Sequence, residues 1–246
     1  MEVSLKYPTL GYKKIARKLR NMGYRINKKL VQRVRRDEFL QIPPRAKKRV
    51  RRGCSTGYPT KAEHRNQVWA WDFVSDHTAT GTIRTFNLID EHTRECHCIY
   101  ADRSLKSEDV LDCLEEAINN NGIPEFIRSD NGSEFIAKIV KDYLKDMGIK
   151  TLYIEPGSPW QNGFAESFNG RFREECLNRE VLHGLREARV VFSEWRKFYN
   201  EERPHRSLQM MTPKEFARRA SPRAGMEEEP IKLDQRQITI QSSPNT

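Results

Sequence analysis

Apolar and polar positions follow two different periods along the chain, and together they predict a sheet combined with helices. The run from Val68 to Val74 is apolar except for Asp72, which is typical of a central strand covered on both faces. Two further strands, joined by a polar turn at residues 91–94, extend it into an antiparallel meander. Strand-like and helical patterns then alternate. The predicted order is βββαβαβα, with elements at residues 68–74, 83–90, 95–101, 107–121, 126–129, 136–147, 149–154 and 163–178.

This order predicts an α/β fold with a mixed five-stranded sheet flanked by helices, because α/β units continue an antiparallel meander. The helix at 107–121 is expected to be capped by Ser107, to end at Asn121-Gly122 and to bury one apolar face. Beyond the sheet, the pattern predicts an amphipathic helix over residues 185–200. A short helix is expected to begin at Thr212-Pro213.

A separate pair of helices is predicted before the sheet. Apolar residues at helical spacing from Tyr12 to Leu19, followed by a stop at Gly23, predict the first helix. Asn27 is expected to cap the second. Its expected inward residues are Leu30, Val31 and Val34, and its expected outward residues are Lys28, Lys29, Gln32, Arg33, Arg35 and Arg36. The pair suits a helix-turn-helix that lays its second helix on DNA; a basic hairpin that touches only phosphates is the alternative.

The net charge of +10 is unevenly distributed along the chain. Residues 1–52 hold 18 Lys and Arg against three acids, a balance of +15, so the rest carries −5. A segment of one sign at this density indicates a surface for nucleic acid. We expect a helix-turn-helix at 1–40, a basic linker at 41–65 that follows the DNA backbone, a catalytic core at 66–180, its helical extension at 181–220 and a flexible tail at 221–246.

Cysteine usage and hydropathy indicate a cytoplasmic protein. No apolar run reaches the roughly 18 residues that a membrane span needs, and the N-terminus lacks the pattern of an export signal. The five cysteines lack paired spacing, which favours reduced thiols. His92, Cys96, His97 and Cys98 raise zinc as an alternative. However, Cys96 and Cys98 lie two apart on a predicted strand, where they would fill one face.

Three acidic residues are the candidates for chemistry. Asp72 lies in the apolar central strand, where a carboxylate is costly unless it meets a cation or strong donors. Asp130 follows a short strand, at the end where open α/β sheets usually bind ligands, and Glu166 lies in the first turn of a helix after a loop. Because the chain has 34 acidic residues, the 35 residues between Asp130 and Glu166 are weak support by themselves. The residues around them carry the argument.

Three carboxylates suit hard divalent ions such as magnesium, which prefer oxygen ligands. Two ions about 3.5–4 Å apart can activate the attacking oxygen of a phosphodiester reaction and stabilise the leaving oxygen, so that no protein nucleophile is needed. The chain has no nucleophile elbow and no phosphate-binding Gly-x-x-x-x-Gly-Lys loop, which argues against covalent hydrolases and ATP-driven enzymes. The predicted chemistry is metal-dependent cutting and joining of DNA.

Several stretches resemble the integrase-type transposases of bacterial insertion sequences, which are relatives of retroviral integrases. They are the residues around Asp72, Ser129-Asp130-Asn131-Gly132-Ser133-Glu134-Phe135, residues 156–178, residues 199–208 with Thr212-Pro213, and residues 11–27. The similarity covers about residues 7–217. It implies a ribonuclease-H-like fold with Asp72, Asp130 and Glu166 as the acidic triad. The triad is expected to bind magnesium or manganese, as two ions when DNA is bound.

In this family a 3′ hydroxyl is freed at the end of the element and then attacks target DNA. The resemblance implies that four further residues contact DNA: Asn131, Asn162, Asn169 and Arg173. Asn169 and Arg173 lie three and seven residues after Glu166 and share its helical face. Viral relatives carry a basic residue four positions after the glutamate, where this chain has Gly170. The expected DNA-binding residues of the second N-terminal helix are Lys28, Lys29, Arg33 and Arg36.

The expected partners are double-stranded DNA, at element ends and target, and further copies of the chain in a homo-oligomer on the bacterial nucleoid. No zinc module precedes the core and no leucine heptad is present. In insertion sequences an upstream reading frame can supply these functions, so its product is a further expected partner. Two alternatives stay open: a nuclease of the same fold that hydrolyses without joining, and a catalytically idle DNA-binding repressor.

Overall fold

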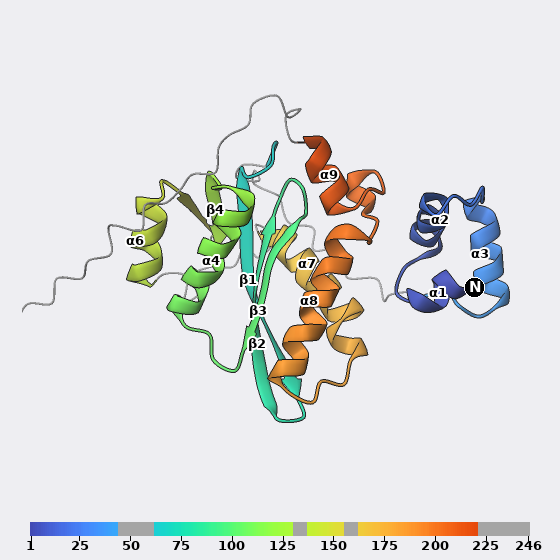
Figure 1. Cartoon of the computed structure of the whole chain (residues 1–246), viewed down its shortest axis with the longest axis horizontal. Helices are drawn as coiled ribbons and strands as arrows, with labels where there is room; N and C mark the ends of the chain where they lie inside the picture. The colour runs from blue at the N-terminus through green and yellow to red at the C-terminus, as the bar shows by residue number, and fades with distance from the viewer. Residues whose placement is uncertain (44–61, 130–136, 155–161, 221–246) are drawn as a thin grey trace, which may run out of the picture.

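A five-stranded mixed sheet with helices on both faces forms the centre of the molecule, as predicted (Figure 1). The computed structural model describes residues 1–43, 62–129, 137–154 and 162–220. The strands are β1 (Val68–Thr78), β2 (Gly81–Asp90), β3 (Cys96–Asp102), β4 (Phe126–Ser129) and β5 (Lys150–Tyr153). The helices and 3-10 turns of this core are α4 (Ser107–Asn121), α6 (Lys138–Asp146), α7 (Gly163–Glu175), η2 (Leu177–Arg179), α8 (Leu185–Glu201), η3 (Arg206–Leu208) and α9 (Pro213–Ala220).

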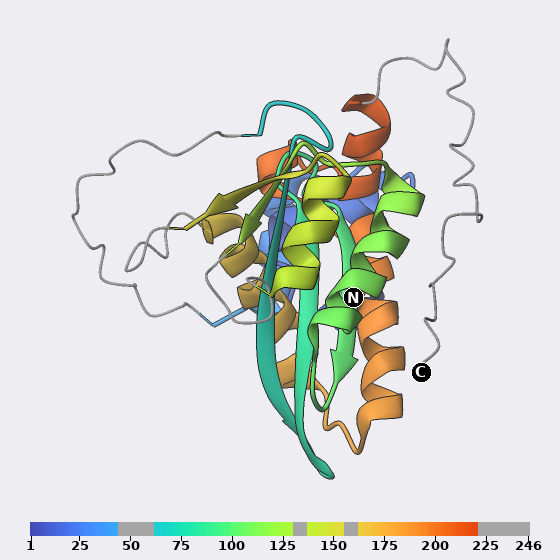
Figure 2. The same ribbon diagram turned by 90° about the vertical axis from the view of Figure 1, so that its left-hand side faces the viewer.

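The strand order is β3-β2-β1-β4-β5, so β1 is central as its apolar run predicts. β1 and β2 form a long antiparallel hairpin, which Figure 2 shows along its length. β4 lies parallel to β1 on the other side, with Val68 paired to Phe126 and Ala70 to Arg128. β5 continues the sheet in parallel with β4. The meander therefore supplies one half of the sheet, and the α/β units supply the other.

Alternation along β1 divides its side chains between two cores. Trp69 and Trp71 belong to the core that the sheet forms with α4 and α6, whereas Ala70 and Val74 belong to the core with α7 and α8. These two helix pairs lie on opposite sides of the sheet in Figure 1. Asp72 has the same parity as Ala70 and Val74 along the strand. It therefore lies on the face that α7 covers.

A bulge in β3 shows that one detail of the sequence prediction is wrong. Cys96 and Cys98 do not fill one face, because Cys98 pairs with Leu88 and Cys96 with Ile89, which leaves an extra residue between them. Cys96 consequently packs into the α7–α8 core and Cys98 against the α4–α6 core. Asn200 of α8 holds this bulge: its Nδ2 donates to Cys96 O at 2.9 Å and its Oδ1 accepts from Cys96 N at 2.8 Å.

The N-terminal helices form a small bundle beside α8 (Figure 1). They are α1 (Glu2–Lys6), α2 (Tyr12–Asn21) and α3 (Lys28–Asp37), and they pack around Leu10, Ile15, Ala16 and Val31. The sequence does not predict α1, because five residues are too few to show a helical period. Asn27 caps α3 as predicted, since its Oδ1 accepts a hydrogen bond of 2.9 Å from Lys29 N.

The buried face of α3 differs from the prediction. Val31 is buried, but Leu30 and Val34 are 39% and 38% exposed, whereas Arg35 is only 3% exposed. Val31 and Arg35 lie four residues apart and so share one face of the helix. Arg35 can occupy this position because its Nη2 donates to Leu40 O at 2.6 Å, which satisfies a carbonyl just beyond the helix. The expectation that Leu30 and Val34 face inward and Arg35 outward is therefore wrong.

Smaller differences concern helix ends. Ser107 is the first residue of α4 rather than its cap; Lys106 occupies the cap position, and its N–H donates to Asp109 Oδ2 at 2.8 Å. α7 ends at Glu175, and the predicted last turn is the 3-10 turn η2. The predicted linker lies largely outside the described residues, and the predicted tail lies wholly outside them. Within the described ranges, no helix combines the length and apolarity needed to cross a lipid bilayer.

Candidate active site

α7 carries the predicted catalytic glutamate and is fixed by an aromatic core. Its buried residues Ala165, Phe168 and Phe172 recur at helical spacing and face α8. The rings of Phe168 and Phe172 lie 5.7 and 5.0 Å from the ring of Trp195. Glu166, in the first turn, is exposed. The aromatic contacts thus fix the rotation of α7, and with it the direction of the Glu166 side chain.

The carboxylate of Asp72 accepts hydrogen bonds from a side-chain amide of α7 and from the next backbone amide of its own strand. Asn169 Nδ2 of α7 donates to Asp72 Oδ2 at 2.8 Å, and Phe73 N donates to Asp72 Oδ1 at 2.8 Å. The other end of the Asn169 amide is fixed by Asn87 Nδ2, which donates to Asn169 Oδ1 at 2.8 Å. Asn87 lies opposite Asp72 in the strand register. Sequence reasoning misses Asn87; its signal is a lone amide within the apolar run of β2.

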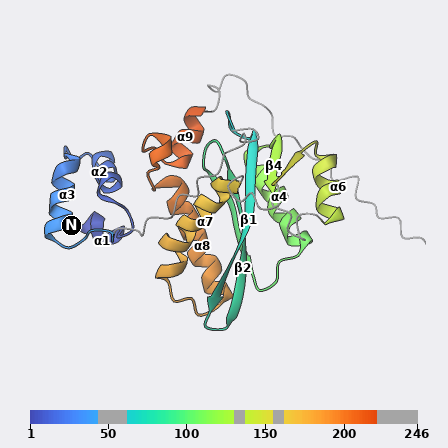
Figure 3. The ribbon, with the colours of Figure 1, turned by 180° about the vertical axis from the view of Figure 1, so that it is seen from behind.

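Two more polar side chains fasten the α7 segment along β1, and Figure 3 shows this helix beside the strand. Asn162 is 5% exposed, and its Nδ2 donates to Trp71 O at 3.4 Å. Arg173 Nη2 donates to Ser75 O at 2.9 Å, and its Nη1 lies 4.0 Å from Asp76 Oδ2. These residues, which the sequence assigns to DNA, have contacts within the protein. Their contacts with DNA stay predictions.

Of the three predicted catalytic acids, the structure describes Asp72 and Glu166, whereas Asp130 and its neighbour Asn131 lie outside the described residues. Asp72 lies on β1, and Glu166 lies on α7, the helix that covers the Asp72 face of this strand. Asn169, one helical turn after Glu166, makes the direct contact with Asp72. Among the described side chains, no three His, Cys, Asp or Glu residues are grouped so that they could hold a metal ion. The oxygen donors of Asp72 and Glu166 nevertheless have the chemistry that magnesium prefers.

The segment after α8 is tied to α7 by a buried ion pair. Arg203 Nε and Nη2 donate to the two carboxylate oxygens of Glu175 at 2.6 Å each, and the side chains are 3% and 5% exposed. His205 lies beside this pair, with its ring edge-on to Tyr199 at 4.7 Å. Burial lowers the pKa of His205 well below its usual value, and nearby cations including Arg203 lower it further. The bidentate pair fixes the position of α7 from its C-terminal end.

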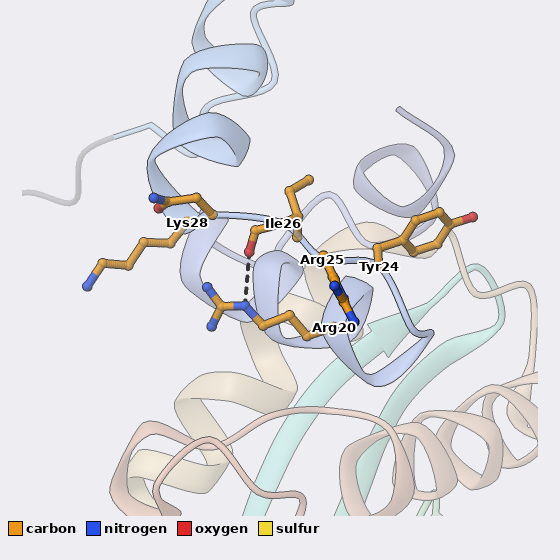
Figure 4. A pocket seen from close by; sticks show the side chains of 6 residues that line it. Arg20, Tyr24, Arg25, Ile26 and Lys28 are labelled. Atoms are coloured by element: carbon orange, nitrogen blue, oxygen red, sulfur yellow. Dashed lines mark hydrogen bonds between the residues drawn. The ribbon is translucent and has the colours of Figure 1, made fainter.

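The predicted DNA-binding residues of α3 all lie on its exposed side: Lys28, Lys29, Arg33 and Arg36. The turn before this helix forms a shallow pocket of about 680 Å³, shown in Figure 4, whose cationic residues are Arg20, Arg25 and Lys28. Arg20 Nε donates to Ile26 O at 3.1 Å, which fastens the turn to α2. The cations of α3 and of the turn are thus clustered on the same small bundle. Such clustering of Lys and Arg is typical of a surface that binds nucleic acid.

Replacing Asn169 by alanine is expected to reduce activity roughly 10–100-fold with little change in fold, because the side chain orients a carboxylate that is predicted to bind metal. The apparent affinity for Mg²⁺ should fall by a similar factor, since Asp72 loses its hydrogen bond from α7. A Mg²⁺ titration of DNA nicking measures both effects. Asn120→Ala, an exposed change on α4, is the matched control. An unchanged Mg²⁺ dependence in Asn169→Ala would exclude the positioning role.

Comparisons with known proteins agree with this architecture. Two models described as the integrase core domain match residues 62–159 and 147–213. An uncharacterized protein of insertion element IS476 from Xanthomonas euvesicatoria is 33% identical over 219 residues, 88% of this chain and 63% of that protein. The chain thus spans less than two thirds of that relative. An uncharacterized protein of insertion element IS407 from Burkholderia multivorans is 33% identical over 213 residues, 84% of this chain and 75% of that protein.

The fold also matches a solved structure. An intasome of simian T-cell lymphotropic virus, in complex with PP2A regulatory subunit B56 gamma, has a TM-score of 0.56 at 14% identity, over 96% of this chain and 81% of that chain. At that identity the likeness concerns the fold alone, and it confirms the predicted ribonuclease-H-like class. The relatives from insertion elements confirm the family that the motifs indicate. The chain therefore belongs to the integrase-type transposases of insertion sequences.

Proposed function

We propose that this protein is a DNA transposase that binds the ends of an insertion sequence, cleaves the 3′ end and transfers it into target DNA in a metal-dependent reaction. The observation that carries the proposal is the hydrogen bond of 2.8 Å from Asn169 Nδ2 to Asp72 Oδ2. It joins the helix of Glu166 to the strand of Asp72 within an integrase core. Two carboxylates on adjoining elements are the beginning of a site for phosphodiester chemistry.

The register of the parallel strands supports Asp130 as the third carboxylate. The last aligned pair of β1 and β4 is Ala70 with Arg128. Asp72 follows Ala70 by two residues, and Asp130 follows Arg128 by two residues. The two acids thus have the same sequence offset from an aligned pair of parallel strands, and this supports including Asp130 in the proposed site. We therefore propose Asp72, Asp130 and Glu166 as the catalytic triad.

Each of these residues has a defined part in the proposed mechanism. The three carboxylates would hold Mg²⁺ or Mn²⁺, as two ions when DNA is bound. The metal would supply activation of the attacking oxygen and stabilisation of the leaving oxygen. Asn169 orients the Asp72 carboxylate, and Asn87 fixes Asn169 from β2. The chain is proposed to act on double-stranded DNA as a homo-oligomer.

The proposal is tested by incubating the purified protein with a labelled duplex from the DNA that flanks its gene, a supercoiled plasmid and Mg²⁺ or Mn²⁺. Joining of the labelled end to the plasmid is the expected result. Nicking of the duplex without joining would instead identify a hydrolytic nuclease. Binding without any metal-dependent nicking would identify a repressor.

Replacing Lys29 and Arg33 of α3 by glutamine is expected to weaken DNA binding roughly 30-fold at 0.15 M salt, because each contact with a phosphate releases about 0.9 counterion. The slope of log affinity against log salt should fall by about 2. Fluorescence anisotropy with end DNA and with unrelated DNA measures both quantities. We expect the preference for end DNA to fall as well, since a recognition helix reads bases. An equal loss on both duplexes would favour the hairpin that touches only phosphates.

A further inference from the structure

A groove of about 860 Å³ lies between the N-terminal bundle and the core. Contacts with the end of α8 place the bundle there. The ring of Tyr7 stacks on Phe198 at 5.3 Å, and its hydroxyl donates to Glu202 Oε2 at 2.6 Å. Lys18 Nζ lies 3.1 Å from the same carboxylate oxygen and 4.0 Å from the centre of the Tyr7 ring. The groove is therefore bounded by two parts of the protein that specific contacts hold together.

The lining of the groove is strongly cationic. Among the described residues that line the groove, Glu175 is the single acid, and the bidentate pair with Arg203 neutralises its charge. The cations that line the groove are Lys14 of α2, Arg94 of the β2–β3 turn, Arg171 of α7, Arg203 after α8, and Arg206 of η3. They come from four segments that are far apart in the sequence, because Arg203 and Arg206 belong to the same stretch after α8. This gathering of positive charge is a property of the fold, because four of the five cations lie outside the basic N-terminal segment of residues 1–52.

Two of these cations, Arg171 and Arg206, are open to a ligand, whereas Arg94 is held deeper in the groove. The guanidinium of Arg94 lies 3.8 Å from the ring centre of Phe164, and its buried Nη1 has no hydrogen-bond partner among the described residues. Arg171 pairs with Glu174 at 3.2 Å, but both side chains are more than a third exposed, so the pair is weak and can be exchanged. Arg206 is exposed. The groove therefore contains donors that a polyanion can engage.

His205 lies among these cations, and the direction of its pKa shift agrees with their position. His205 lines the groove, and burial lowers its pKa well below the usual value. Repulsion by Arg203, Lys14, Arg94 and Arg171 lowers it further, in that order. All four line the groove together with His205, and Arg203 Nη1 lies 3.2 Å from His205 Nε2. The imidazole stays neutral and adds no charge of its own, since its protonated form is opposed by burial and by the cations.

We infer that this groove binds the phosphate backbone of duplex DNA on its way to the active site, with Lys14, Arg171 and Arg206 as phosphate contacts. Gly163, Ser167 and Arg171 line the groove at intervals of four residues and so share one face of α7. Asn169, which donates to Asp72, lies on the face toward β1, and exposed Glu166 lies one helical turn before it. DNA passing the N-terminal end of α7 would thus meet the groove on one side of the helix and the carboxylates on the other. The inference rests on the proposed function, in which DNA is the substrate.

The test compares the wild-type chain with Lys14→Gln/Arg206→Gln and with the control Lys141→Gln/Lys145→Gln on the exposed side of α6. Both double variants lose the same charge. Anisotropy titrations of end DNA over a range of salt should show the slope of log affinity against log salt falling by about 2 for the groove variant, and affinity falling roughly 30-fold at 0.15 M salt. The control should retain both values. Equal losses in the two variants, or none in the groove variant, would overturn the inference.

An added negative charge tests the groove without removing any of its cations. Ser207 lines the groove and is exposed, so Ser207→Glu places a negative charge in it; Ser193→Glu on exposed α8 is the control. Affinity should fall only for Ser207→Glu, with the midpoint of unfolding unchanged in both variants. These readouts measure binding alone. A chain that binds through the groove but never joins DNA would therefore refute the proposed function and leave this inference standing.

Discussion

Replacing Asp72 by asparagine is expected to abolish strand transfer, by roughly 10³-fold or more, because a metal-dependent reaction relies on several kcal/mol of charge stabilisation from its ligands. The change should leave the fold intact. Asparagine has nearly the same shape, and its side-chain oxygen can still accept the hydrogen bond from Asn169 Nδ2. DNA binding should also persist, since the cations of α3 and of the groove are untouched.

The measurement is single-turnover joining of a labelled end to plasmid, together with binding of the same DNA and thermal unfolding. Asp142→Asn is the matched control: it makes the same chemical change on the exposed side of α6. We expect wild-type joining from the control and none from Asp72→Asn. Joining at a rate near wild type in Asp72→Asn would refute the assignment of the triad, and with it the proposed mechanism.

The sequence predicts the position of Asp72 well, because period and burial agree there. An apolar run interrupted by one aspartate predicts a central strand, and the parity along that strand puts Asp72 on the face of α7. The position of Glu166 follows similarly, from a loop-forming cluster followed by a helical stripe. Both predictions depend on local patterns, which regular strands and helices preserve.

Prediction from the sequence fails where a long-range contact overrides a local pattern. The bulge at Cys96 breaks the rule that residues two apart share a face, and it is stabilised by Asn200, more than a hundred residues later. In α3, the carbonyl of Leu40 makes burial of Arg35 favourable, which charge patterning alone does not reveal. The cationic groove is a third case, because its cations come from four separate segments of the chain. Only the fold brings such residues together.

α7 connects the parts of the core, because it contacts α8, β1 and the segment after α8. Its aromatic face packs on α8, its amide and guanidinium groups hold β1, and Glu175 receives Arg203. A helix fixed on so many sides presents Glu166 with little freedom, which suits a carboxylate that must meet others at a defined distance. Residues of the N-terminal bundle and of α7 line the two sides of the same groove. The predicted DNA-binding and catalytic parts are therefore adjacent in space.

Replacing Arg128 by methionine is expected to destabilise the fold by about 3–5 kcal/mol, because it leaves the buried carboxylate of Glu91 without its cation. Arg128 Nε lies 2.6 Å from Glu91 Oε1, and the side chains are 2% and 0% exposed. Arg128 belongs to β4, directly before Ser129 and Asp130, so the pair also anchors the strand that leads to the third proposed carboxylate. Urea unfolding measures the change. Arg128→Met/Glu91→Leu, which removes both charges, should recover much of the loss, and exposed Lys214→Met should cost less than about 1 kcal/mol.

The loss of unfolding free energy in Arg128→Met should increase with pH. Burial raises the pKa of Glu91 above its usual value, and Arg128 opposes that rise. Without Arg128 the folded-state pKa rises further, so folding favours the protonated carboxyl. Below the unfolded-state pKa of about 4.3, Glu91 is protonated in the folded and the unfolded chain, so the difference in free energy of unfolding between variant and wild type should be small. This difference should grow as pH rises through the folded-state pKa of Glu91 in the variant. A deficit that is constant between pH 4 and pH 8 would show that lost packing, rather than an unpaired buried charge, destabilises the variant.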